Sequence, residues 1–120
     1  MKLSRVIAAR DSGVIAGTLT LQTRKPWAID ATYFTPCRRV VYLINMAVMP
    51  EHQRSGVGRA LLDEALAQSR AVPFEAIRLD AYDGPAGAGE FYRRCGYRHV
   101  GGKSYRGLAL MYFELMTHLR

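Results

Sequence analysis

A short glycine-containing segment near the middle of the chain has the residue types that bind an anion. It reads Gln53-Arg54-Ser55-Gly56-Val57-Gly58 and lies between an apolar run and a helical pattern. Glycine has no β-carbon, so backbone N–H groups in such a loop approach phosphate oxygens closely. The first N–H groups of the following helix have no partner inside the helix and carry its positive dipole end. Arg54 and Arg59 flank the segment and can add charge-assisted hydrogen bonds.

Three other interpretations of this loop compete. A P-loop needs Gly-x4-Gly-Lys-Ser/Thr, and no Lys-Ser or Lys-Thr follows these glycines, which argues against a Walker-type NTPase. A dinucleotide fingerprint needs a third glycine where the chain has Leu61, although Asp80 lies at about the distance of a ribose-binding acid. The third interpretation is a tight turn with no ligand, which an isolated Gly-x-Gly fits equally well.

The elements around the loop follow from hydrophobic periodicity. Runs at 6–10 and 14–21, separated by Asp11-Ser12-Gly13, predict a hairpin, and the run 40–49 before Pro50 predicts a central strand. Apolar faces predict helices over 58–70 and 88–95, the second ended by Gly96. Strands are expected at 76–81 and 109–115, with a further short strand at 98–100. The predicted order is β-β-β-α-β-α-β.

This order predicts an α/β fold with a mixed sheet. A strand, helix and strand in succession over 40–81 favour a right-handed crossover with parallel strands. The segment 24–39 has no clear period and is long for a connection, which is typical of functional loops. A chain of 120 residues that is 49% apolar fills one core, so residues 1–120 are expected to form a single domain.

Composition narrows the partners and the location. The net charge of +7 divides into +6 for residues 1–60 (nine Lys/Arg, three Asp/Glu) and +1 for residues 61–120 (eight against seven). This indicates an anionic partner, either nucleic acid or a phosphate-bearing cofactor, unless the surplus Arg serves solubility. No apolar run reaches the roughly 18 residues of a membrane span, and nothing marks the start for secretion, so a cytoplasmic location is predicted. Cys37 and Cys95 indicate neither a zinc site nor a disulfide framework.

Two stretches of the chain resemble motifs of the GNAT superfamily of acetyl-CoA-dependent N-acetyltransferases. Residues 42–62, YLINMAVMPEHQRSGVGRALL, are similar to its acetyl-CoA motif with the core Gln/Arg-x-x-Gly-x-Gly/Ala. Residues 88–97, AGEFYRRCGY, are similar to its later motif, a Phe-Tyr helix that ends at Gly-Phe or Gly-Tyr. The resemblance runs from about Val6 to Leu115. It implies a mixed, mostly antiparallel sheet with a bulged and splayed central strand and helices on both faces.

The resemblance also implies a cofactor site. The pantetheine arm of acetyl-CoA would pair with the exposed edge of the central strand, as an added strand does. The loop and the helix start would take the pyrophosphate, and no metal is implied. The expected cofactor-binding residues are Met46, Ala47, Val48, Gln53, Arg54, Ser55, Gly56, Val57, Gly58, Arg59, Ala60 and Tyr92.

Catalysis would be direct attack of a neutral amine on the thioester. The Val48 backbone N–H would stabilise the oxyanion, and Tyr92 would hydrogen-bond the sulfur and protonate the departing thiolate. Many family members have a Glu on the central strand as the base, but this chain has Asn45 there. The possible substitutes are a water relay or one of four side chains: Asp80, Asp83, Glu90 and His99.

The acceptor side is the least defined part of the sequence. The family usually begins with a strand and two helices that wall the acceptor site, whereas the hairpin here starts at Val6. Trp27 and Tyr33 in the segment 24–39 are expected to help rebuild that wall. An unpaired first strand would favour a homodimer. A catalytically silent coenzyme A-binding module is the main alternative function; a nucleic-acid-binding domain is disfavoured because no such motif is present.

Overall fold

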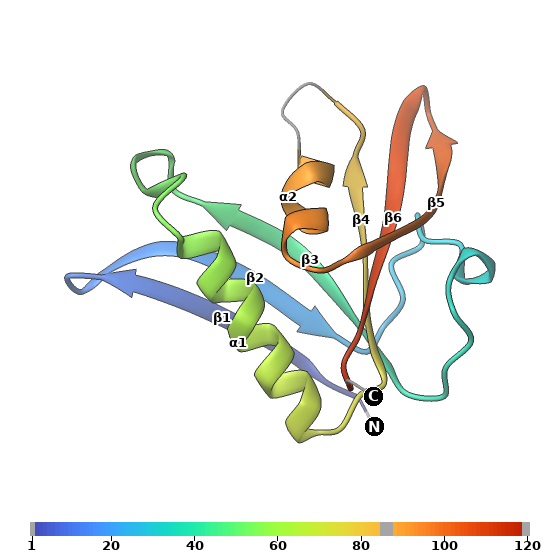
Figure 1. Cartoon of the computed structure of the whole chain (residues 1–120), viewed down its shortest axis with the longest axis horizontal. Coiled ribbons are helices and arrows are strands. Elements are labelled where there is room, and N and C mark those ends of the chain that lie inside the picture. Colours follow the sequence, from blue (N-terminus) through green and yellow to red (C-terminus); the bar gives the residue numbers. More distant parts are fainter. Residues whose placement is uncertain (1, 85–87, 119–120) are drawn as a thin grey trace.

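The computed structural model describes residues 2–84 and 88–118, which form a six-stranded sheet in the order β1-β2-β3-β4-β6-β5 (Figure 1). β3 and β4 pair in parallel, and the other neighbouring strands pair antiparallel. The predicted α/β class with a mixed, mostly antiparallel sheet is therefore confirmed. In chain order the elements are β1 (Ser4–Asp11), β2 (Val14–Gln22), the 3₁₀ turn η1 (Ala31–Tyr33), β3 (Val40–Val48), the 3₁₀ turn η2 (Pro50–His52), α1 (Val57–Ala71), β4 (Ala76–Tyr82), α2 (Ala88–Arg94), β5 (Arg98–Tyr105) and β6 (Leu108–Met116).

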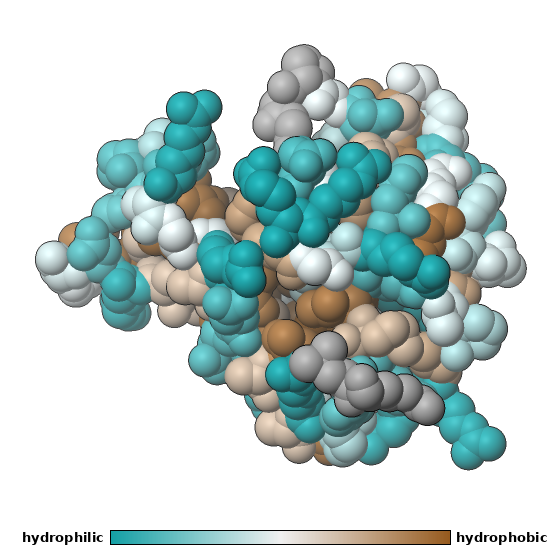
Figure 2. All heavy atoms as spheres, viewed as in Figure 1, coloured by the Kyte–Doolittle hydropathy of each residue, from teal (hydrophilic) through white to brown (hydrophobic). Residues whose placement is uncertain are grey.

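Both helices pack on the same face of the sheet, so the expectation of helices on both faces is wrong for the described residues. Side chains alternate along each strand, and those pointing toward α1 and α2 form one apolar cluster with the helices. In Figure 2, apolar residues are visible between the hydrophilic surface over α1 and the hydrophilic surface over α2. That cluster includes Leu19, Leu21, Val41, Leu43, Leu61, Leu62, Ala65, Ile77, Leu79, Tyr92 and Phe113.

The opposite face is covered by the segment 24–39 and not by an α-helix. Ile29 and Phe34 from this segment join a second apolar cluster with Tyr42 of β3 and with Leu110 and Tyr112 of β6. The short turn η1 is part of this cover and contacts β5. We call the segment 24–39 the cover segment, because it shields apolar side chains that would otherwise face water.

The strand expected at 98–100 extends through Tyr105 and forms a hairpin with β6. Gly101 and Gly102 obscured it, because glycine disfavours strands and usually marks turns. The structure shows why glycine stands there. A β-carbon on Gly102 would lie 2.4 Å from the Leu110 carbonyl oxygen, and one on Gly101 would lie 2.5 Å from the Tyr33 ring.

The central strand β3 is bulged and leaves its parallel neighbour early, as the resemblance implied. β3 and β4 pair only where 40–42 meet 76–78, and the last pair is Tyr42 with Arg78. Beyond it the two strands diverge, which Figure 1 shows between the labels β3 and β4. The register between β2 and β3 shifts where Asn45 adopts a φ of +54°, a conformation that Asn tolerates better than most residues. We call the divergence of β3 and β4 beyond this last pair the fork.

β1 and β5 are the edge strands of the sheet. On β1 and at the start of β2, Val6 and Val14 are 67% and 64% exposed. The homodimer expected from an open first strand remains a prediction. None of the helices within 2–84 and 88–118 is long and apolar enough to cross a membrane.

Candidate functional site

The glycine loop places the start of α1 after the end of β3 and the turn η2. Gly56 is the N-cap of α1 with a φ of +88°, and a β-carbon there would meet nothing within 4 Å, so glycine is needed for conformation and not for space. The first intrahelical bond runs from the Ala60 N–H to the Gly56 carbonyl oxygen at 3.0 Å. The N–H groups of Val57, Gly58 and Arg59 precede it and have no acceptor within the helix. They provide the donors that a pyrophosphate requires.

Gly58 has a packing role in addition to the one expected. Both glycines were expected to let an anion approach, but a β-carbon on Gly58 would lie 3.0 Å from the Phe91 ring and 3.5 Å from the Met46 methyl carbon. Gly58 therefore allows α2 to pack against the start of α1. The motif that carries the loop and the motif that carries Phe91 are in direct contact.

Polar side chains of the loop bind the loop itself. Gln53 Nε2 donates to the Val48 carbonyl oxygen at 3.3 Å, and the Ser55 hydroxyl donates to the His52 carbonyl oxygen. His52 in turn lies 3.6 Å from the Asp11 carboxylate in the β1–β2 hairpin. Among the predicted cofactor residues, Gln53 and Ser55 thus position backbone instead of presenting free side chains.

The two arginines of the loop remain on the surface. Arg54 is exposed and has a φ of +66°. Arg59 lies 3.5 Å from Asp63 one turn later on α1, with both side chains more than half exposed. Such surface pairs contribute about 0.5 kcal/mol or less, so the Arg59 guanidinium can exchange its partner for a phosphate at little cost.

The fork exposes main-chain groups of β3 where the cofactor arm was expected. The Met49 N–H donates to the Ala16 carbonyl oxygen of β2 at 2.8 Å, and Val48 lies opposite Gly17. Because N–H direction alternates along a strand, the Val48 N–H points away from β2, toward the fork. The Val48 carbonyl oxygen, which accepts from Gln53, points the same way. This edge of β3 can therefore accept an extended guest, as in strand addition.

Tyr92 extends from α2 toward this edge. Its hydroxyl donates to the Met46 thioether sulfur at 3.7 Å, and its side chain is only 9% exposed. Burial raises the pKa of Tyr92 to about 12, with smaller contributions from Asp80 and Cys95. The phenol is thus neutral at physiological pH and able to donate a proton. Met46 contacts both Gly58 and Tyr92, so it joins the two motifs at one point.

The four side chains considered as bases lie in different settings. Asp83 is exposed just after β4, and Glu90 lies 3.6 Å from Arg93 on α2. His99 is exposed, with its ring 5.3 Å from that of Phe113. Asp80 alone of the four is partly buried on a strand of the fork, and burial raises the pKa of its carboxyl group.

A hollow with a volume of about 490 Å³ lies between the cover segment and the end of β5. Trp27 lines it and meets Tyr105 edge-on at a ring distance of 4.5 Å. Tyr33, the other expected wall residue, packs instead on Gly101 and Tyr112. Sequence reasoning missed the wall residues from β5, because its glycines obscured that strand. The polar wall comprises Lys25, Asp30, Thr32, Lys103 and Ser104.

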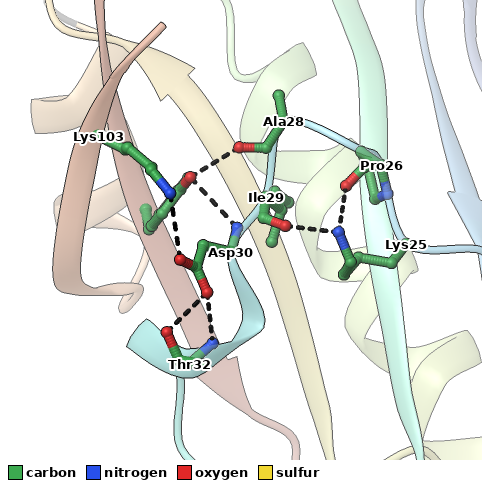
Figure 3. Close-up of polar contacts among 8 residues, drawn as sticks. Lys25, Pro26, Ala28, Ile29, Asp30, Thr32 and Lys103 are labelled. Carbon is green, nitrogen blue, oxygen red and sulfur yellow. Dashed lines mark hydrogen bonds and ion pairs between the residues drawn. The ribbon is translucent and has the colours of Figure 1, made fainter.

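Side-chain contacts fix the shape of the cover segment near this hollow (Figure 3). The Tyr112 hydroxyl donates to the Ala28 carbonyl oxygen at 2.7 Å and accepts from the Asp30 N–H at 3.3 Å. The Asp30 carboxylate accepts from the Thr32 N–H at 3.0 Å and pairs with Lys103 at 3.3 Å. These hydrogen bonds lower the pKa of Asp30, with those from Thr32 dominant.

A network of charged and polar groups around the buried carboxylate of Glu114 holds the other end of the cover segment. Glu114 of β6 is 1% exposed and accepts from the Thr35 N–H at 2.9 Å and from Arg98 at 2.8 Å. Burial opposes its ionisation, but the hydrogen bonds from Thr35 and Arg98 lower the pKa of Glu114 overall. Arg78 of β4 donates to the Thr35 carbonyl oxygen at 2.9 Å and lies over the Phe34 ring at 5.1 Å.

Comparisons with known proteins agree with this geometry. The structure resembles an aminoglycoside 6′-N-acetyltransferase complexed with coenzyme A (TM-score 0.79, 14% identity, 98% of this chain and 74% of that one). It also resembles nourseothricin acetyltransferase (TM-score 0.75, 24% identity, 96% and 66%). A third similar structure is the ribosomal-protein-alanine N-acetyltransferase from Brucella melitensis (TM-score 0.73, 20% identity, 92% and 67%). At these identities the likeness shows the fold, and the chain spans about two thirds to three quarters of their lengths.

The chain thus has the α/β fold that these acetyltransferase structures share. Residues 2–97 match the acetyltransferase (GNAT) family, and the chain belongs to that family. The resemblance read from the two sequence motifs is therefore confirmed. No curated protein sequence matches the chain.

Proposed function

We propose that the protein transfers the acetyl group of acetyl-CoA directly to a primary amine. The observation that carries this proposal is the meeting of both motifs at Met46. There the donors of the α1 start, the open edge of β3 and the neutral Tyr92 phenol lie around one point. Family membership and the coenzyme A complex of a structural neighbour support the choice of cofactor.

The chain offers a binding group for each successive part of acetyl-CoA. The free N–H groups of Val57, Gly58 and Arg59 would hold the pyrophosphate, and the helix dipole would favour its charge. Main-chain groups of Met46 to Val48 would hold the extended pantetheine arm, and the loop residues Gln53 to Ser55 would keep the entrance in shape.

At the reacting end, two groups would act on charge that develops during transfer. The Val48 N–H, directed into the fork, would donate to the thioester oxygen as it becomes negative. Tyr92 would donate its proton to the leaving sulfur, and the hydroxyl already donates to a sulfur atom, that of Met46. Its raised pKa, about 12, keeps the phenol protonated before transfer.

The acceptor would enter from the face of the cover segment, because both helices occupy the other face. Trp27 and Tyr105 offer aromatic surface there, and Asp30 and Lys103 offer paired charges. The acceptors named for the similar structures range from antibiotics to a ribosomal protein, so they do not select one for this chain.

Calorimetric titration with coenzyme A, followed by measurement of thiol release from acetyl-CoA, tests the proposal. The amine panel comprises an aminoglycoside, a polyamine, free lysine and a peptide with N-terminal alanine. We expect saturable binding and turnover with at least one amine. Binding without turnover would favour the catalytically silent module, and the absence of binding would reject both.

A further inference from the structure

The hollow between the cover segment and the end of β5 lies level with the fork. β4 passes Arg78, its last residue paired with β3, before it reaches Tyr82. Tyr82 lies opposite Leu110 of β6, and Leu110 lies opposite Lys103 of β5 in the wall of the hollow. Because neighbouring strands lie about 4.8 Å apart, β5 is about 10 Å from β4. A small molecule of this length can therefore connect the hollow with the fork.

An exposed tryptophan lines this hollow. Trp27 is 72% exposed, and the edge-on contact with the Tyr105 ring supports it from one side. The Arg106 guanidinium lies 5.5 Å from the centre of the Tyr105 ring, so that ring already has a cation over it. Large aromatic side chains contribute most when they are buried by a partner. The exposed surface of Trp27 thus offers packing area for a planar or apolar group.

The hollow is also lined by an ammonium group that has no acidic partner. Lys25 Nζ donates to the carbonyl oxygens of Pro26 at 3.0 Å and of Ile29 at 2.6 Å (Figure 3). These bonds hold the ammonium in place but do not neutralise its charge. Among the described residues, no carboxylate forms an ion pair with Lys25. An anion that enters the hollow therefore meets a positioned positive charge.

The carboxylate in the wall, that of Asp30, is already occupied. It accepts from the Thr32 N–H at 3.0 Å and from the Thr32 hydroxyl at 2.6 Å, and it pairs with Lys103 at 3.3 Å. An incoming ammonium would have to displace Lys103 and would face two like charges, which is costly. An incoming carboxylate or phosphate would bind Lys25 and compete for Lys103, whose side chain is 56% exposed. The charges of the hollow thus favour an anion over a cation.

We propose that the hollow binds the end of the acceptor that lies away from the reacting amine, and that this end is a planar or apolar body with an anionic group. The assignment rests on the proposed acetyltransferase function and adds the class of its substrate. Lys25 and Lys103 bind the anion and Trp27 packs on the body, while the amine reaches the fork. Acceptors with several ammonium groups, such as aminoglycosides and polyamines, are disfavoured.

Four probes that share one scaffold test this assignment: phenethylamine, and the same amine with a para carboxylate, a para phosphate or a para aminomethyl group. Trp27 is the one tryptophan of the chain, so its fluorescence reports binding at the hollow without turnover. With coenzyme A at saturation, both anionic probes should bind at least about tenfold more tightly than phenethylamine, because hydrogen bonds between charged groups are strong. The aminomethyl probe should bind most weakly, and kcat/KM with acetyl-CoA should follow the same order. The difference between carboxylate and phosphate shows which anion the hollow takes.

Substitutions of Lys103 test the charge directly, since its exposed ion pair contributes little to folding. Lys103→Gln should weaken binding of the anionic probes by about fivefold and leave phenethylamine within about twofold. Lys103→Glu should reverse the order, so that the aminomethyl probe binds more tightly than the carboxylate probe. Arg10→Gln is the matched control, because it removes the same charge from β1, at the edge of the sheet opposite β5. It should leave the affinities for all four probes unchanged.

Three results would overturn the assignment while leaving the acetyltransferase function intact. The first is turnover of phenethylamine or the aminomethyl probe with a kcat/KM equal to that of the anionic probes. The second is an anionic preference that both Lys103 variants retain, and the third is turnover of a probe that leaves Trp27 fluorescence unchanged. A wild type that turns over neither these probes nor any other amine would instead reject the proposed acetyltransferase function, and with it the acceptor assignment.

Discussion

The fork, which lies within the sheet, and the cover segment, which packs on one of its faces, are built in different ways. At the fork, backbone groups dominate: free N–H groups at α1, an unpaired edge of β3 and carbonyl oxygens that hold Gln53 and Ser55. Under the cover segment, side chains dominate: the Tyr112 hydroxyl, the Glu114 carboxylate and the Arg78 guanidinium fix a chain that has little regular structure.

This difference indicates which of the two regions tolerates side-chain substitutions. A site made of backbone depends on chain conformation and tolerates many side chains, whereas a segment held by buried ionic groups depends on each partner. We therefore expect changes under the cover segment to affect stability and acceptor use, and changes at the fork to affect cofactor binding and rate. Four predictions test this separation, from the largest expected effect to the smallest.

Replacing Glu114→Ala should lower the free energy of unfolding by about 3 kcal/mol, because it leaves the Thr35 N–H and the Arg98 guanidinium without their buried acceptor. Urea unfolding measures the change. The pKa of Glu114 is lowered in the fold, so its contribution is present above pH 4.5 and lost as pH falls further. The difference between wild type and variant should shrink accordingly in acid, while coenzyme A affinity stays the same. A tenfold loss of that affinity would contradict the separation of the two regions.

Tyr92→Phe should reduce kcat by about 100-fold, equivalent to roughly 2.7 kcal/mol, because the leaving thiolate loses its proton donor. Coenzyme A affinity should change little, since the ring and its packing against Tyr97 and Phe113 remain. Steady-state kinetics with calorimetry separates the two quantities. An unchanged kcat would remove Tyr92 from the mechanism.

Gly58→Ala should cost about 1–2 kcal/mol of stability by displacing Phe91, and it should weaken coenzyme A binding because α2 shifts relative to α1. Gly56→Ala is the matched comparison. There the added methyl meets no atom within 4 Å, but the positive φ strains the loop by about 1 kcal/mol. Thermal unfolding of both variants, with and without coenzyme A, distinguishes packing from conformation. If Gly58→Ala and Gly56→Ala lowered the stability and the stabilisation by coenzyme A to the same extent, Gly58 would not act as a packing residue.

Arg59→Gln should weaken coenzyme A binding about threefold at low salt and less at high salt, because an exposed guanidinium contributes modestly and is screened. Asp63→Asn, which removes the surface partner of Arg59, should leave binding equal or slightly tighter. Titrations at two ionic strengths measure both. Salt-independent binding in wild type would mean that the loop cations do not contact the phosphates.

The arrangement of the glycine loop, β3 and α2 was predictable because its signals are local. Short runs of adjacent residues indicate both motifs: Gly56 at a helix start, and Phe91-Tyr92 shortly before Gly96. In the structure, Met46 contacts both of them. The common face of both helices was not predictable, since periodicity shows that a helix has an apolar side and not which face of the sheet it covers.

The contacts of the cover segment were hidden for a different reason. Thr35 meets Glu114 and Ala28 meets Tyr112 across 79 and 84 residues of chain, and no short pattern announces such contacts. The extension of β5 beyond Val100 was masked by glycines that are there to admit Tyr33 and the β6 backbone.

The bulge at Asn45 changes the phase of β3. Before it, Val41 and Leu43 face the helices; after it, the even-numbered Met46 and Val48 do. Without the extra residue, the side chains of Met46 and Val48 would stand one position earlier in the strand and would face the helices there as well. Deleting Asn45 would therefore preserve every side-chain direction while straightening the backbone. Such a deletion variant isolates what a single inserted residue contributes to catalysis, a separation that no point substitution in this strand can achieve.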